Sequence, residues 1–352
     1  MAETAALRAL VCGDFGNATQ PLARQCAEAL AELGLEVARV DTEVPRRKLP
    51  EAAKRWSKSL AKLVGKKQAL SRHYDQRERA VRNDRVRRAF LDKRPNLVLV
   101  IRGNDLERDL LDEMRLAGAL TSCWWIKDAK RIEMMAAERD AYDLYYCIHR
   151  DHCSRGIRYL PAYALDPGRF PVAAERRYTR DIGFVGIWNP KRQSYLAPLA
   201  DLQLGIVGPG WRTRSLLADR RLVRHVHAAR LHGKALVEFY RSSRIVVNIN
   251  QWDSAQASGT TLRVADVPAC GAFLLTEYSA GLEEVFRLDR EIVVFSSPAE
   301  LADKARYYLA HDAQRETIAR AGRERAQRLP RHVDRMREIV RDARSLIEAG
   351  RA

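Results

Sequence analysis

Short apolar runs alternate with helical segments along this chain, and the alternation occurs in two series. In the first series we expect strands at residues 7–12, 35–40, 96–101, 123–126, 144–148 and 157–160. The second series follows a polar linker and has expected strands at residues 182–187, 204–207, 245–249, 272–275 and 292–295. This alternation is typical of parallel sheets covered by helices. We therefore predict an α/β protein with two Rossmann-like domains.

The same pattern places the domain boundaries. We expect a first domain at residues 1–172, a second at residues 180–330 and a C-terminal helix at residues 331–352. Helices of the second domain are expected at residues 192–200, 233–243, 261–269, 279–287, 298–310 and 312–328. The 352 residues suit two domains of ordinary size, and an apolar content of 46% excludes a disordered chain.

The positive charge is concentrated in one segment. The chain has a formal net charge of +17, and residues 45–94, a helical insertion in the first domain, hold 18 basic and five acidic residues. Such a surface favours anionic partners: phosphorylated substrates, nucleic acid or an anionic membrane. Trp56, Leu60, Leu63 and Val64 share one helical face, so we expect docking on an anionic membrane or a lipid-linked or phosphorylated acceptor. The alternative is a solvated basic face, and isolated Trp56 and Tyr74 disfavour nucleic-acid binding.

The remaining composition indicates a reducing compartment. The N-terminal sequence does not resemble a signal peptide, and no apolar run approaches the roughly 20 residues that span a bilayer. The six cysteines form no CxxC motif, and the Cys- and His-containing residues 147–153 match no zinc spacing. We expect a cytoplasmic protein without metal, on the inner face of the membrane if it meets one.

Two loops after expected strands contain candidate ligand-binding residues. Gly13, Gly16 and Asn17 belong to a glycine-rich turn that could present backbone N–H groups to an anion or a sugar hydroxyl. This turn matches neither GxGxxG nor a P-loop, and tight turning alone is the alternative. Gly186 precedes Lys191 and Arg192, whose cations would suit a diphosphate at the carboxyl end of a parallel strand; the alternative is a solvated helix start.

Residues 248–278 form the richest candidate segment. Asn250 follows a strand, and Thr260 and Thr261 precede a helix that contains Arg263 and Asp266. Hydroxyl and N–H groups suit a diphosphate, and a carboxylate one turn later suits a ribose diol.

This segment resembles the C-terminal half of CgeB-like glycosyltransferases, which are spore-maturation-type GT-B enzymes. The resemblance covers about 100 residues and includes the motif residues Arg263, Asp266, Pro268, Ala269, Gly271 and Leu275. It implies two facing Rossmann-like domains, with a nucleotide-sugar donor on the C-terminal domain and the acceptor across the cleft. This chain departs from the pattern at Asp266, where the family usually has Glu, and at Ser258, where broader GT-B enzymes have a glutamate aimed at the donor sugar.

The resemblance predicts glycosyl transfer from a UDP-, GDP- or dTDP-sugar co-substrate, without a tightly bound cofactor, to a hydroxyl of a glycan, lipid-linked or protein acceptor. Asp128 is the first candidate base and His149 the second; an N-cap role is the alternative for Asp128. Two other functions remain open: binding of nucleic acid or an anionic surface without catalysis, and sugar-nucleotide epimerisation.

Overall fold

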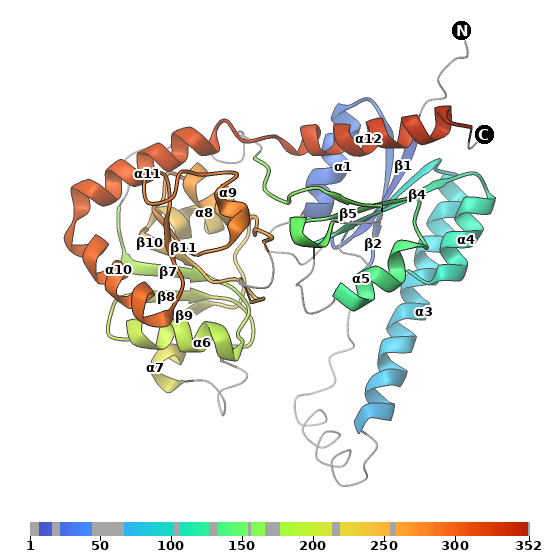
Figure 1. The fold of residues 1–352 in the computed structure, drawn as a ribbon. Helices are drawn as coiled ribbons and strands as arrows, with labels where there is room; N and C mark the ends of the chain where they lie inside the picture. The colour runs from blue at the N-terminus through green and yellow to red at the C-terminus, as the bar shows by residue number, and fades with distance from the viewer. Residues whose placement is uncertain are drawn as a thin grey trace. The chain divides into compact units, whose positions relative to one another are not determined.

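The computed structural model describes residues 7–15, 22–43, 67–101, 106–126, 132–153, 156–165, 177–212, 219–253 and 258–350. The chain forms two compact units (Figure 1). The first comprises Met1–Lys127, Glu133–Tyr146 and Met336–Ala352, and the second comprises Asp128–Ile132 and Cys147–Arg335.

One six-stranded sheet has the order β2-β1-β3-β4-β5-β6. Its strands are β1 (Arg8–Gly13), β2 (Glu36–Asp41), β3 (Leu97–Ile101), β4 (Leu120–Trp125), β5 (Leu144–Cys147) and β6 (Ile157–Tyr159). The pairs β1–β2, β1–β3 and β3–β4 are parallel. The accompanying helices are α1 (Leu22–Glu32), α3 (Lys67–Lys93), α4 (Arg108–Leu116), α5 (Ile132–Arg139) and α12 (His332–Glu348).

The other six-stranded sheet lies in the second unit and has the order β12-β11-β10-β7-β8-β9. Its strands are β7 (Arg180–Val185), β8 (Leu204–Val207), β9 (Val226–Ala228), β10 (Ser243–Asn248), β11 (Leu274–Glu277) and β12 (Val293–Phe295). All five neighbouring pairs are parallel. The helices are α6 (Pro190–Leu196), α7 (Arg220–Val223), α8 (Gly233–Arg241), α9 (Arg263–Ala269), α10 (Pro298–Ala310) and α11 (Asp312–Ala326).

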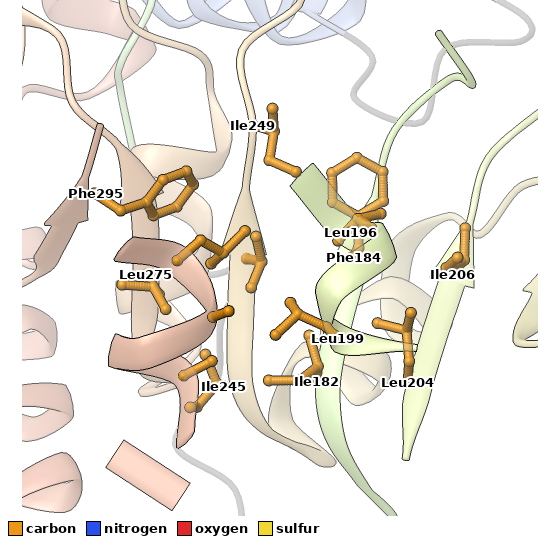
Figure 2. Packing of buried hydrophobic residues seen from close by; sticks show 14 of the residues in the cluster. Ile182, Phe184, Leu196, Leu199, Leu204, Ile206, Ile245, Ile249, Leu275 and Phe295 are labelled. Atoms are coloured by element: carbon orange, nitrogen blue, oxygen red, sulfur yellow. The ribbon is translucent and has the colours of Figure 1, made fainter. Parts of the chain in front are cut away.

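The central strand β10 shows why the second sheet is covered on both faces. Side chains alternate along a strand, so Ile245 and Val247 enter one apolar cluster and Val246 enters another. The first cluster includes residues of α6 and α10, and the second includes residues of α8 and α9. Figure 2 shows the first cluster, where Ile245 and Ile249 lie among side chains from the neighbouring strands. A continuous apolar run is the expected pattern for such a doubly covered strand.

The predicted α/β class with two parallel sheets is confirmed, with local differences. Strand β4 begins at Leu120 instead of residue 123, because the polar side chains at its start have partners inside the fold. The Ser122 hydroxyl donates to the Val98 carbonyl over 3.0 Å, and the Thr121 hydroxyl donates to Asp143 over 3.1 Å. Strand β9 was not expected, because its three residues include His227 and directly follow His225, so they form no apolar run.

The prediction of an α-helix at residues 279–287 is wrong. A 3₁₀ turn at Ala280–Leu282 is found there instead. Leu282, Val285 and Phe286 are buried in the second cluster through consecutive turns whose hydrogen bonds are mostly of the i→i+3 type.

Helix α3 confirms helical structure within the basic insertion. Val86 and Phe90 are buried, while Arg77 and Arg79 are exposed. Arg82 donates to the Thr42 carbonyl over 2.8 Å, so part of the basic surface fastens the helix to its own domain. The apolar face at residues 56–64 lies outside the described residues. No helix in the described part of the chain is long and apolar enough to cross a membrane.

Candidate functional site

The candidate site lies at the carboxyl edge of the second sheet. Strands β7, β10 and β11 are neighbours and run parallel, so the residues that follow them meet at one edge. Ligands of open α/β sheets bind at this edge. The structure therefore brings together the predicted residues after β7 and those after β10.

Arg192 is held by backbone groups. Asn189 caps α6 by accepting a hydrogen bond from the Arg192 backbone N–H over 2.7 Å. The buried guanidinium donates from Nε and Nη2 to the Ile249 carbonyl and from Nη1 to the Ile187 carbonyl, at 3.0–3.1 Å. Burial, together with the charge of Arg263, lowers the pKa of Arg192 to about 9. Gly186 makes room for this side chain, since a Cβ there would lie 3.1 Å from the guanidinium carbon.

Lys191 is neutralised by a residue that the sequence analysis missed. Its Nζ lies 2.6 Å from a carboxylate oxygen of Glu277 and 2.6 Å from the Trp252 carbonyl. The other carboxylate oxygen of Glu277 accepts from the Asn250 backbone N–H over 2.9 Å. Glu277 ends β11, and the acidic residue directly after the apolar run at 272–275 was the available signal.

Arg263 differs from both of these cations. Its Nε donates to Asn248 Oδ1 over 2.8 Å, and Thr261 Oγ1 donates to the same oxygen over 3.3 Å. Within the described residues, its guanidinium forms no ion pair with a carboxylate. Burial lowers the pKa of Arg263, because little surrounding negative charge offsets the lost hydration. Among the described residues, the site thus contains two neighbouring guanidinium groups with no carboxylate bound directly to either one.

A short segment before β6 clamps the loop at residues 258–261. The Gly259 N–H donates to His149 Nδ1 over 3.0 Å, and the Ser258 N–H donates to Asp151 over 2.9 Å. The Arg150 N–H donates in return to Ser258 Oγ over 3.1 Å. Ser258 therefore helps to fix the loop. We call residues 149–151 the clamp.

The clamp is itself anchored by an ion pair. Arg150 binds the Glu284 carboxylate with two nitrogens, at 2.7 and 3.0 Å, and lies over the ring of Tyr159. The buried His149 ring also makes an edge contact with Trp252, with 5.3 Å between centroids. Because Nδ1 accepts a hydrogen bond, the proton of the neutral imidazole lies on Nε2. This tautomer makes the ring a hydrogen-bond donor through Nε2.

The remaining predicted site residues lie in the clamped loop, in α9, in the first unit or outside the described residues. Thr260 and Asp266 are buried, in the clamped loop and in α9 respectively. Gly13 ends β1 in the first unit, where a Cβ would lie 2.6 Å from Ala23 Cβ, so close packing against α1 requires glycine. Gly16, Asn17 and Asp128 lie outside the described residues. In the part of the chain that is described, no group of three or more His, Cys, Asp or Glu residues could hold a metal ion.

Comparison with protein families identifies the region that contains this site. Residues 191–341 match the family described as "Glycosyl transferase-like". This glycosyl transferase-like region includes Lys191, Arg192, the clamped loop, Arg263 and Glu277. No curated protein sequence matches the chain.

Solved structures show the same fold as this chain. Sucrose-phosphate synthase from Thermosynechococcus elongatus has a TM-score of 0.66 and 14% identity, covering 97% of this chain and 100% of its own. Anabaena HepE in complex with UDP and glucose has a TM-score of 0.60 and 10% identity, covering 96% and 100%. A glycosyltransferase from Rickettsia africae has a TM-score of 0.62 and 9% identity, covering 97% and 99%. The expected GT-B fold class is thus confirmed, and the narrower CgeB-like subtype stays a prediction.

Proposed function

We propose that this protein transfers a sugar from a nucleotide-diphosphate donor to an acceptor hydroxyl. The observation that carries the proposal is the pair of neighbouring guanidinium groups, Arg192 and Arg263, at the ligand-binding edge of the second sheet. A buried positive charge without a bound carboxylate is costly, and an anionic ligand would offset that cost. The glycosyl transferase-like region and the shared fold support a sugar diphosphate as that ligand.

We assign the diphosphate to Arg263, assisted by the hydroxyls of Thr260 and Thr261. Lys191 is a weaker candidate for direct contact, because Glu277 already neutralises it over 2.6 Å. Arg192 adds positive potential but uses its N–H groups on backbone carbonyls. Asp266 remains the proposed partner of the ribose diol, and Gly186 and Asn250 line the same edge.

In the proposed reaction an acceptor oxygen attacks the anomeric carbon, and the bond from that carbon to the diphosphate oxygen breaks. Arg263 stabilises the negative charge that develops on the leaving diphosphate, in both an inverting and a retaining route. The hydroxyl proton passes to Asp128 in the inverting route and to the departing phosphate in the retaining route. His149 keeps its proton on Nε2, so its geometry favours positioning of the 258–261 loop over the role of a base.

For the acceptor, we propose a hydroxyl on a glycan, lipid-linked or protein molecule. The exposed Arg77 and Arg79 on α3 support docking of an acidic acceptor or an anionic membrane face on the basic insertion at residues 45–94. Co-sedimentation with vesicles of increasing phosphatidylglycerol content tests the membrane version. Sedimentation that does not depend on the phosphatidylglycerol content would exclude membrane docking.

The donor is tested by incubating the pure protein with UDP-, GDP- and dTDP-sugars, with and without bacterial surface glycan fractions. UDP-glucose is the first candidate, since HepE has been solved with UDP and glucose. We expect nucleotide release that increases with an acceptor, and a thermal shift with one nucleotide class. Conversion of the donor sugar without any acceptor would indicate an epimerase instead.

Two further outcomes would contradict the proposal. The absence of hydrolysis, transfer and thermal shift with every donor would exclude a nucleotide-sugar enzyme. Salt-sensitive binding of nucleic acid in the same preparation would then favour a binding protein without catalysis.

A further inference from the structure

A separate cavity lies at the opposite, amino-terminal edge of the second sheet. It has a volume of about 500 Å³ and is formed where β7, β8 and β9 begin. Its lining residues are Thr179, Arg180, Gln203, Leu204, Gly205, Arg224, His225, Val226 and His227. The residues proposed for the donor follow the carboxyl ends of β7 and β10. None of the residues that line the cavity is among them, and none takes part in the proposed reaction.

The lining combines cationic and neutral polar groups without an acid. Arg180 and Arg224 supply positive charge, and His225 and His227 supply imidazole rings. None of the nine lining residues is Asp or Glu. Two acids lie near the lining: Asp181 accepts from the Gln203 backbone N–H over 3.2 Å and pairs with Arg244 at 3.5 Å, and the charge of Glu238 offsets part of the effect of burial on Arg180. The cavity is therefore an electropositive pocket, which suits an anion.

Arg180 is built into this pocket and keeps donors unused. Its Nη1 donates to Ser242 Oγ over 2.6 Å and to the Phe239 carbonyl over 3.1 Å, and its guanidinium lies over the Phe239 ring. Gly205 permits this path, since a Cβ there would lie 2.8 Å from Arg180 Cδ. Within the described residues, Nε and Nη2 have no hydrogen-bond partner, and Arg180 forms no ion pair. Burial lowers the pKa of Arg180, and the charge of Glu238 offsets only part of this effect.

Arg224 and His227, which also line the cavity, offer further donors. Arg224 uses Nη2 on the Ala200 carbonyl, at 2.8 Å, and Nε on His225, at 3.2 Å, which leaves Nη1. His227 rests against Phe239 with 5.8 Å between ring centroids, and in the described part of the chain its ring nitrogens form no hydrogen bond. Two arginines with spare N–H groups, plus an imidazole, match the several oxygens of one phosphate group.

From this arrangement we infer that the cavity binds a small molecule through a phosphate group, at a site separate from the donor site. Arg180 provides the fixed, partly buried cation, and Arg224 and His227 close the contact from the exposed side. The inference does not depend on the proposed glycosyl transfer, because none of its residues serves that reaction.

Isothermal titration with inorganic phosphate at low ionic strength tests the inference. The Arg263→Ala variant is used as the background, so that phosphate bound at the carboxyl edge does not contribute. We expect one phosphate site to remain in this variant. Adding Arg224→Gln and His227→Gln, both exposed positions, should weaken that site about tenfold or more.

A matched control removes the same charge outside the cavity. Arg220 is exposed on the neighbouring α7 and does not line the pocket, so Arg220→Gln should leave phosphate affinity within about twofold of the background. Loss of all phosphate binding in Arg263→Ala would overturn the inference. Equal affinity in the Arg224→Gln/His227→Gln variant and the background would overturn it as well.

Discussion

Helix α3 and the carboxyl edge of the second sheet use positive charge in opposite ways. Many cations of α3 lie at the surface, and several pair with acids in the same unit, such as Arg88 with Asp84 and Arg87 with Glu113. The carboxyl edge has few cations, but Arg192 is buried and neither Arg192 nor Arg263 has a carboxylate bound to it among the described residues. Exposed charges are screened by water and salt, whereas buried charges are screened much less. Arg192 and Arg263 at the carboxyl edge should therefore dominate ligand binding. The exposed cations of α3 should mainly attract anionic partners to the surface.

The largest effect is expected for Arg192→Ala. This change removes the donors of the Ile187 and Ile249 carbonyls and leaves space at the end of β7. We expect the free energy of unfolding to fall by about 2–4 kcal/mol. Urea denaturation followed by circular dichroism measures it; a loss below about 0.5 kcal/mol, the range of ordinary surface substitutions, would place Arg192 with the surface charges.

Arg263→Ala should act mainly on the ligand. Loss of a charged hydrogen bond to a diphosphate costs about 1.5–3 kcal/mol, or roughly 10- to 150-fold in the dissociation constant. Arg263→Lys is the matched control, because it keeps the charge and should retain part of the affinity. Titration with the responsive nucleoside diphosphate measures both variants, and unchanged affinity in Arg263→Ala would remove this residue from the site.

Gly259→Ala tests the clamp. A Cβ at residue 259 would overlap the buried His149 ring, so the loop and the ring must move apart. We expect a cost of about 1–3 kcal/mol in stability, with weaker nucleotide binding. The His149→Ala background makes room for the new methyl, so the effect of Gly259→Ala should be smaller there. Additive effects in this double-mutant cycle would show that the clamp does not position the loop.

The smallest effect is expected on α3. Arg87 and Glu113 are each about two-fifths exposed, and their contact of 2.8 Å raises the pKa of Arg87. Solvent screening limits the contribution of such a pair to about 0.2–1 kcal/mol, so Arg87→Gln should barely change thermal stability. Arg77→Gln with Arg79→Gln should leave nucleotide affinity unchanged while weakening sedimentation with anionic vesicles. A marked loss of nucleotide affinity in that double variant would break the distinction between the two regions.

Much of the second unit could be predicted from its residues, because its strands leave a strong pattern. The apolar run at residues 245–247 becomes the centre of strand β10, and the polar residues Asn248 and Asn250 lie at the ligand edge. Strand β9 and the 3₁₀ turn at Ala280–Leu282 were missed, because three-residue elements have no period to detect. Their conformations are set by neighbours that are distant in sequence.

In the candidate site, too, some features follow from local sequence and others from contacts between distant residues. Arg263 and Asp266 could be selected from their motif, and Arg192 from its place after a strand. The pairing of Lys191 with Glu277 spans 86 residues, and the bond from Gly259 to His149 spans 110 residues. Groups so far apart in sequence show no shared local pattern, so their contacts could not be predicted from residue spacing.

The sequence by itself determined the α/β class, the two series of strands and the position of the basic insertion, because periodicity and composition are local properties. The tertiary structure decided which cations are available. It neutralised Lys191, committed Arg192 to backbone carbonyls and left Arg263 without a bound carboxylate in the described residues. It also gathered Arg180, Arg224 and His227 around one cavity. The availability of a charge depends on its burial and its partners, and both arise only when distant parts of the chain meet.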